Sequence, residues 1–346
     1  MRPERLLDRS GTTEGETVRR SRSVVAMSLL LVGAMFAAAC GDDDEPTTQP
    51  SGDSSADTEP SGDKPAIKIV QNAWTASAIE AEIAKQLIEK ELGNSVEIVS
   101  IDENAMFTGL SDGDLDFVLE IWPSGIDETE QAFIDDGSVV EVGDLGAVGQ
   151  IGWFVPGYVI EDHPELATWE GFKDAETAKL FATASTGDKG RFLGTDPSYS
   201  QYDEPIISNL ELPFVVEYSG SEPSTIAELD TRVNAGEPVL MYWWTPTAAV
   251  AKYDLKLVEL PEYSDACYEV TEEVDCAYPA DQLKKLASAE LQSKDAAVWS
   301  FVENFAMSND DQLALLPSVE IDGEPAADIA AQWIAENEAI WGPWFS

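Results

Sequence analysis

The stretch from residue 67 to residue 121 reads IKIVQNAWTASAIEAEIAKQLIEKELGNSVEIVSIDENAMFTGLSDGDLDFVLEI. Its apolar residues alternate between short strand-like runs and a helical spacing that ends at Gly93. The predicted elements are strands at 67–72, 96–101 and 115–121 and helices at 77–92 and 104–111. Strand, helix and strand in this rhythm predict a parallel sheet with crossover helices, so the expected fold class is α/β.

The same alternation returns after residue 163. The predicted elements there are helices at 203–210 and 224–235 and strands at 214–218 and 239–243. Further along, the chain becomes mostly helical, with candidate helices at 295–305, 310–316 and 325–337. We therefore expect two α/β units of similar size, followed by a helical C-terminal part.

The composition of the chain excludes one class of partner and indicates a large folded core. The chain has 346 residues with 66 Asp and Glu against 20 Lys and Arg, a formal charge of -46. Such an anionic surface repels phosphate, which excludes a nucleic-acid partner. Hydrophobic residues make up 44% of the chain, enough to bury a large core. The length beyond the N-terminus exceeds what one core usually organises and favours two lobes.

Residues 1–39 have the features of a bacterial lipoprotein signal peptide. Three arginines, at 19, 20 and 22, precede an apolar run at 24–39 that is too short to span a membrane comfortably. Three alanines then lead into Cys40, which resembles a lipobox whose cysteine is lipidated. An ordinary secretory signal with an incidental cysteine is the alternative. We expect an anchor on the extracytoplasmic face of the cell membrane, held by lipid alone because no basic patch faces the membrane.

Residues 40–64 are predicted to form an acidic tether, which begins with the lipidated cysteine. From residue 41 it reads GDDDEPTTQPSGDSSADTEPSGDK and contains no large apolar residue, so we expect it to stay solvated.

Two cysteines remain, Cys267 and Cys276, with eight residues between them in a polar segment. Outside the cytoplasm such a pair most simply forms a disulfide. A metal site is the alternative, but there is no second cysteine pair and the one histidine, His163, is about a hundred residues away. We therefore predict a disulfide and no metal or other cofactor.

Catalytic motifs are scarce. There is no Gly-x-Ser-x-Gly elbow, no phosphate-binding glycine loop and no HExxH, and His163 precedes a proline in a polar turn, as a surface residue would. Asp114, Asp116 and Glu120 alternate along one predicted strand, where either a solvated edge or a glycosidase-like acid pair would explain them. An extracellular acid-pair hydrolase therefore stays an alternative, as does a structural lipoprotein without a ligand.

Tryptophans end three of the predicted strands. Trp74 follows the first strand, Trp122 the third, and Trp243 and Trp244 a strand of the second unit. In open α/β sheets the carboxyl ends of the strands line the ligand crevice, although a tryptophan more often packs in a core. Four further tryptophans have core-like spacing on C-terminal helices, and we expect these to pack: Trp299, Trp333, Trp341 and Trp344.

These features together resemble a known family. The motifs are NAW at 72–74, EIWP at 120–123, DPSY at 196–199, GSE at 220–222 and YWWTP at 242–246. With the lipobox and the tether, their set and order resemble the glycine betaine/choline/carnitine binding proteins of ABC importers. The resemblance implies a two-lobe type II periplasmic-binding-protein fold with a two-stranded hinge, which closes on a quaternary ammonium solute. Lobe one would be 65–156 and 258–346, and lobe two 157–257.

The resemblance also implies a site. The aromatic cage of the family falls on Trp74, Trp122 and Trp244, and the solute carboxylate would meet backbone N–H groups of Ser198 and Tyr199. The Tyr199 ring is either an additional wall or a surface turn residue. Where the family often has a histidine, this chain has Thr247, whose hydroxyl is shorter and uncharged.

The expected function is that of a monomeric, lipid-anchored, non-enzymatic receptor that delivers a solute to the permease of an ABC importer. The resemblance favours glycine betaine, with choline or carnitine as alternatives. In the family this histidine reaches the solute carboxylate. Because choline has no carboxylate, the absence of the histidine leaves choline as an alternative solute.

Overall fold

The structure, a computed structural model, describes residues 64–199 and 201–346. The predicted signal peptide, Cys40 and all but the last residue of the predicted tether lie outside the described residues.

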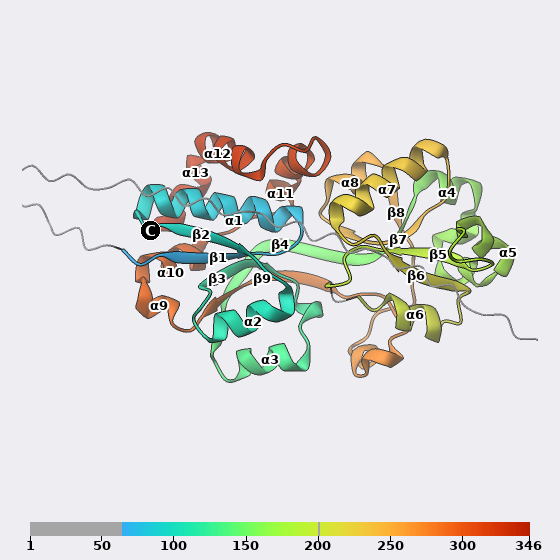
Figure 1. The fold of residues 1–346 in the computed structure, drawn as a ribbon, viewed down its shortest axis with the longest axis horizontal. Coiled ribbons are helices and arrows are strands. Elements are labelled where there is room, and N and C mark those ends of the chain that lie inside the picture. Colours follow the sequence, from blue (N-terminus) through green and yellow to red (C-terminus); the bar gives the residue numbers. More distant parts are fainter. Residues whose placement is uncertain (1–63, 200) are drawn as a thin grey trace, which may run out of the picture. The chain divides into compact units, whose positions relative to one another are not determined.

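Nine strands of the described residues form one sheet, in the order β2-β1-β3-β9-β4-β7-β5-β6, with β8 paired to β4 (Figure 1). The strands are β1 Ile67–Gln71, β2 Val96–Ser100, β3 Phe117–Ile121, β4 Val139–Pro156, β5 Gly190–Gly194, β6 Phe214–Tyr218, β7 Leu240–Thr245, β8 Leu255–Leu257 and β9 Ala280–Ser288. Strand β1 is parallel to β2 and β3, and β5 is parallel to β6 and β7. The predicted α/β units are confirmed. We call β1, β2, β3 and β9 the β1 half of the sheet, and β5, β6 and β7 the β5 half.

Strand β4 joins the two halves. It pairs antiparallel with β9 between residues 139 and 150 and with β7 between 150 and 154. The sequence reading missed this strand because glycines interrupt its apolar pattern. Gly143 and Gly146 have φ angles of 115° and 112° and lie at shifts of the β4–β9 register, where a left-handed backbone favours glycine.

Helices cover both faces of the β1 half, as βαβ crossovers require. In Figure 1, α1 and α12 lie on one face of β1, β2 and β3, and α2 and α3 on the other. The α-helices are α1 Thr75–Leu87, α2 Glu103–Ser111, α3 Glu128–Asp135, α4 Gly157–Asp162, α5 Ala175–Ala178, α6 Asp203–Asn209, α7 Glu222–Ala235, α8 Ala248–Lys252, α9 Leu291–Lys294, α10 Ala296–Asn304, α11 Asn309–Leu316, α12 Ala326–Glu336 and α13 Glu338–Trp341.

The C-terminal part agrees with the sequence reading except at its start. Helices α10, α11 and α12 confirm the three candidate helices, but β9 comes first and pairs with both β3 and β4. Trp333, Trp341 and Trp344 are buried as expected, whereas Trp299 is only partly buried against the core.

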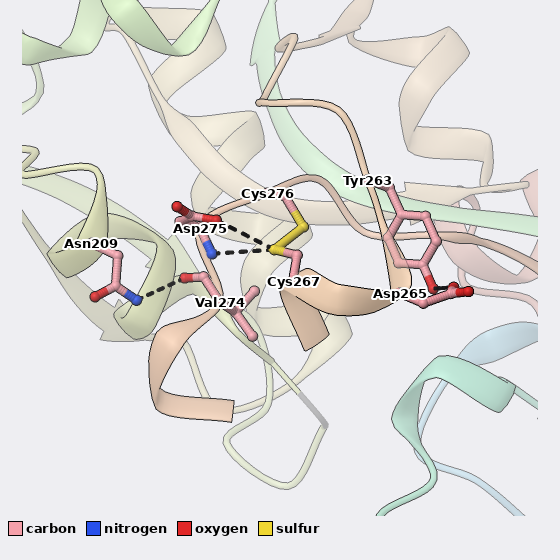
Figure 2. Close-up of a disulfide and its surroundings, with 7 residues drawn as sticks. All are labelled: Asn209, Tyr263, Asp265, Cys267, Val274, Asp275 and Cys276. Carbon is pink, nitrogen blue, oxygen red and sulfur yellow. Dashed lines mark hydrogen bonds between the residues drawn. A yellow bond between two sulfur atoms is a disulfide. The ribbon is translucent and has the colours of Figure 1, made fainter. Parts of the chain in front are cut away.

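The predicted disulfide between Cys267 and Cys276 is confirmed, with their Cα atoms 6.4 Å apart (Figure 2). It closes a loop of two 3₁₀ turns, Asp265–Tyr268 and Thr271–Glu273. The loop is fixed to α6 by Asn209, whose Nδ2 donates to the carbonyl of Val274 at 3.0 Å. Within residues 64–199 and 201–346, no helix has both the length and the apolar character needed to cross a membrane.

Candidate functional site

One cavity gathers aromatic side chains from both halves of the sheet. Its lining consists of Trp74, Glu103, Trp122, Gly125, Ile151, Tyr199, Tyr242 and Trp244, around an empty volume of about 390 Å³ that is partly open to solvent. Trp74 lies three residues past the end of β1 and Trp122 comes directly after β3, and the carboxyl ends of these parallel strands share one edge of the sheet. Trp244 lies on β7 in the other half. The cavity is therefore built where the two halves meet.

The aromatic rings meet nearly at right angles. Trp74 and Tyr199 lie 5.7 Å apart with an 84° angle between their planes, and Tyr199 and Trp244 lie 6.0 Å apart at 80°. Trp244 is stacked at 4.4 Å on Trp243, which is fully buried. Rings at right angles to one another present their faces to the cavity from several directions. This arrangement suits a compact cation with an apolar surface.

The buried carboxyl group of Glu120 binds two of the tryptophan side chains that line the cavity. Glu120 Oε1 accepts hydrogen bonds from Nε1 of Trp74 at 2.8 Å and from Nε1 of Trp122 at 2.9 Å. Of the two explanations left open for these acids, the solvated edge is wrong for Glu120, because β3 lies between β1 and β9 and the residue is 1% exposed. Asp116, on the same predicted strand, is also buried and pairs with Lys294 at 2.8 Å.

Glu120 belongs to a wider acid network. Gln312 Nε2 donates to Glu80 Oε1 at 2.8 Å and to Glu120 Oε2 at 3.5 Å. Burial raises the pKa of Glu120 to about 7, although the two indole N–H groups oppose this shift. Burial and the neighbouring Glu120 raise the pKa of Glu80 well above its usual range. We infer that Glu80 holds a proton and Glu120 is the acceptor for the indoles.

Glycine is required where Trp122 crosses β4. A Cβ atom at Gly149 would collide with the six-membered ring of Trp122, so only a residue without a side chain lets the indole lie flat there. The position of Trp122 is therefore fixed at both ends, by Glu120 at its nitrogen and by the backbone at Gly149.

Hydrogen bonds join the two halves beside the cavity. The Tyr199 hydroxyl donates to the carbonyl of Ala73 at 3.0 Å. The backbone N–H and the hydroxyl of Thr75 both donate to Glu222 Oε2, at 2.7 and 2.9 Å. Burial and the nearby Glu320 raise the pKa of Glu222 to about 8. With these contacts the cage rings are at most 9% exposed, so a solute in the cavity would be largely out of water.

One acidic residue, Glu103, belongs to the cavity lining. It is the first residue of α2, and its carboxyl group accepts no hydrogen bond from any other described residue. Burial, then the charge of Glu130 and of Asp102, raises the pKa of Glu103 to about 8. Among the described residues, the lining contains no lysine, arginine or histidine.

Residues 65–336 match the family model described as the substrate binding domain of ABC-type glycine betaine transport systems. The chain belongs to this family. The family consists of extracytoplasmic solute-binding proteins, so the resemblance seen in the sequence is confirmed.

Similar proteins agree with the family assignment. A trimethylamine N-oxide-binding protein from Pelagibacter ubique is 26% identical over 286 residues, which cover 81% of this chain and 90% of the relative. The structure of a glycine betaine and L-proline-binding protein from Borrelia burgdorferi has a TM-score of 0.67 at 18% identity, over 82% of this chain and 97% of that one. A choline-binding protein of an ABC transporter, solved with choline, has a TM-score of 0.64 at 19% identity, over 81% and 91%. These likenesses show the two-lobe type II periplasmic-binding-protein fold.

The family motifs do not all reach the cavity. Trp74, Trp122, Tyr199 and Trp244 line it together. Ser198 lines a neighbouring groove, and its N–H donates to Asp196 Oδ1 at 2.9 Å.

The backbone N–H of Tyr199 is also engaged, since it donates to the carbonyl of Asp196 at 3.1 Å. The Thr247 hydroxyl accepts from Trp243 Nε1 at 2.7 Å and donates to the carbonyl of Trp244 at 3.2 Å, so it supports the tryptophan pair from behind. A contact of Ser198, Tyr199 N–H or Thr247 with a solute stays a prediction.

Sequence reasoning missed four residues of the cavity lining, Glu103, Gly125, Ile151 and Tyr242, and also Glu120, which supports it. Tyr242 had a signal, since it lies two positions before Trp244 and therefore on the same face of β7. Glu120 lies two positions before Trp122, but nothing in the sequence shows that it bridges two indoles. Glu103 had no signal, because α2 is one of many segments rich in acids. Among the described residues, no group of three or more His, Cys, Asp or Glu side chains is placed to hold a metal ion.

Proposed function

We propose that this protein is a receptor that binds a small solute with a trimethylated nitrogen and delivers it to the permease of an ABC importer. The aromatic cavity carries the proposal. A trimethylated nitrogen has no N–H to donate, so its best partners are the faces of electron-rich rings, each worth about 0.5–2 kcal/mol when desolvated. Trimethylamine N-oxide, glycine betaine and choline, which similar proteins are named for, all carry this group.

Binding and closure of the two halves would be coupled. Trp74 and Trp122 come from the β1 half and Trp244 from the β5 half, so all three rings reach the solute only when the halves meet. A solute shifts such an equilibrium only by binding the closed form better than the open one. The role is one of capture and release, with no chemical step.

The sequence of the N-terminal segment supports a membrane-anchored receptor. Lipidation of Cys40 would anchor a monomer on the extracytoplasmic face of the membrane, and the acidic tether at 40–64 would let the folded part reach the permease. Replacing Cys40 by serine should move the protein from the membrane fraction to the soluble fraction. A Cys40→Ser variant that stays with the membrane would contradict a lipid anchor.

Titration calorimetry of the mature chain tests the binding function. The panel contains glycine betaine, proline betaine, carnitine, choline and trimethylamine N-oxide. We expect binding of at least one, and a loss of about tenfold to a hundredfold in affinity in Trp244→Ala. Trp299→Ala is the matched control, since Trp299 lies on α10 and does not line the cavity. No binding by any solute, or equal affinity in Trp244→Ala, would refute the proposal.

A further inference from the structure

Two acidic side chains connect the halves of the sheet, one in each direction. Glu222 is the first residue of α7, which joins two strands of the β5 half, and its Oε2 accepts from the backbone N–H and the hydroxyl of Thr75 at 2.7 and 2.9 Å. Thr75 is the first residue of α1, in the β1 half. An acid of the β5 half therefore binds the N-terminus of a helix in the β1 half, where N–H groups have no partner within the helix.

The second acid makes the reverse connection. Glu320 lies in the π-helical segment Pro317–Ile321, which follows α11, a helix that packs on α1 of the β1 half. Its Oε2 accepts from the backbone N–H of Ala248 and its Oε1 from that of Ala249, both at 2.8 Å. These two residues begin α8 in the β5 half, and the N-cap residue Thr247 makes no side-chain cap to that helix. Glu320 supplies the missing cap from the other half.

Both connections lie beside the aromatic cavity and outside it. Helix α1 starts directly after Trp74, and α8 starts four residues after Trp244. Neither Glu222 nor Glu320 is among the described residues that line the cavity. Glu222 lines the neighbouring groove instead. The four hydrogen bonds therefore join the halves close to two of the cage rings without contact with a solute in the cavity.

The two acids can lie near each other without the repulsion of two carboxylates. Burial, and then the charge of Glu320, raise the pKa of Glu222 to about 8, so Glu222 holds a proton at neutral pH. A protonated carboxyl group still accepts through its carbonyl oxygen, and both bonds from Thr75 go to one oxygen of Glu222. Glu320 differs, because each of its oxygens accepts from a separate N–H group of α8.

We propose that Glu222 and Glu320 form a reciprocal clasp, in which each half supplies the acid that binds a helix N-terminus of the other, and that this clasp sets the rate at which a solute leaves the cavity. The clasp rests on the proposed receptor function and adds to it the residues that control release. Separation of the halves breaks all four hydrogen bonds. A solute enclosed by rings from both halves leaves only after the halves open, so a weaker clasp should speed opening and release alike.

The test measures solute release by stopped-flow, and opening of the solute-saturated mature chain by single-molecule FRET between dyes on the two halves. The solute is the one in the calorimetry panel that binds wild type most tightly. Glu222→Ala and Glu320→Ala should each release it about tenfold faster, because each loses two hydrogen bonds between the halves, and opening should speed up by the same factor. Asp174→Ala is the matched control. Asp174 accepts from two N–H groups at the start of α5, within one half, so this variant should release the solute at the wild-type rate.

Conservative variants separate the clasp from a general loss of packing. Glu222→Gln keeps the one oxygen that accepts both bonds from Thr75, so release should stay within about twofold of wild type. Glu320→Gln places an NH2 group against one N–H group of α8, so release should approach the rate of Glu320→Ala. Thr75→Val removes one donor and should speed release in wild type, but should have no further effect in Glu222→Ala.

Release within about twofold of wild type in both alanine variants would overturn the proposal. Faster release without faster opening would also overturn it, since the variants would then have disturbed the cavity itself. If an alanine variant does not fold, Thr75→Val and Glu320→Gln decide, and wild-type release in both counts against the clasp. Failure of every solute to bind wild type would instead refute the receptor function.

Discussion

Replacing Glu120 by alanine should destabilise the fold and loosen the cage together. The buried carboxyl group accepts from the indole nitrogens of Trp74 and Trp122 at 2.8 and 2.9 Å, and the variant leaves both N–H groups without an acceptor. A buried donor left unpaired costs about 1–3 kcal/mol, so the two together should lower the free energy of unfolding by about 2–6 kcal/mol. Glu120→Gln keeps an acceptor oxygen for both indoles, but its NH2 group takes the place of the oxygen that accepts from Gln312, so we expect a loss smaller than that of Glu120→Ala.

Urea unfolding followed by tryptophan fluorescence measures both variants, and a titration with tetramethylammonium reports the state of the cage. Glu120→Ala should bind this cation about tenfold more weakly, because two of its walls are no longer fixed. Equal unfolding free energies for Glu120→Ala and wild type would refute the bridging role. A glutamine variant as unstable as the alanine variant would show that the charge, and not the shared acceptor, matters.

Gly149→Ala should displace the ring of Trp122 and weaken solute binding by about tenfold with the fold retained; unchanged affinity would contradict the close approach. Burial raises the pKa of the carboxyl groups of Glu103, Glu120 and Glu222 to about 7 to 8, from about 4.5 in the unfolded chain. Their contribution to the free energy of unfolding is therefore full below about pH 4.5 and is lost as the pH rises to about 8. The melting temperature should therefore fall between about pH 5.5 and about pH 8, and a rise over this interval would contradict the shifts. Opening the loop with Cys267→Ser and Cys276→Ser should lower the free energy of unfolding by about 2–3 kcal/mol and leave the solute affinity within about twofold; a tenfold loss of affinity would show that the loop positions the cage.

The sequence was most informative where local periodicity and burial agree. The elements between residues 67 and 121 follow from apolar spacing alone, since each strand is short and apolar and each crossover helix has one apolar face. Strand β4 was missed because its glycines, which the bulges and the ring of Trp122 require, look like a loop in the sequence. Strand β4, which joins the two halves, is therefore the element that the local sequence pattern does not reveal.

For the site, the sequence indicated the aromatic residues but not the acids. Tryptophans at strand ends are rare enough to notice, and Trp74, Trp122 and Trp244 do line one cavity. Acidic residues number 66, so neither Glu103 nor Glu120 differs from the others in the sequence. Their roles depend on burial and on distances across the fold, which no local spacing contains.

The most direct test of the aromatic cavity is a crystal structure of the mature chain with the solute of the panel that binds most tightly. The trimethylated nitrogen should lie within about 6 Å of the ring centroids of Trp74, Trp122 and Trp244. The assignment would be contradicted if the solute were bound in the neighbouring groove beside Ser198 and Glu222 and not in the cavity between the three tryptophans.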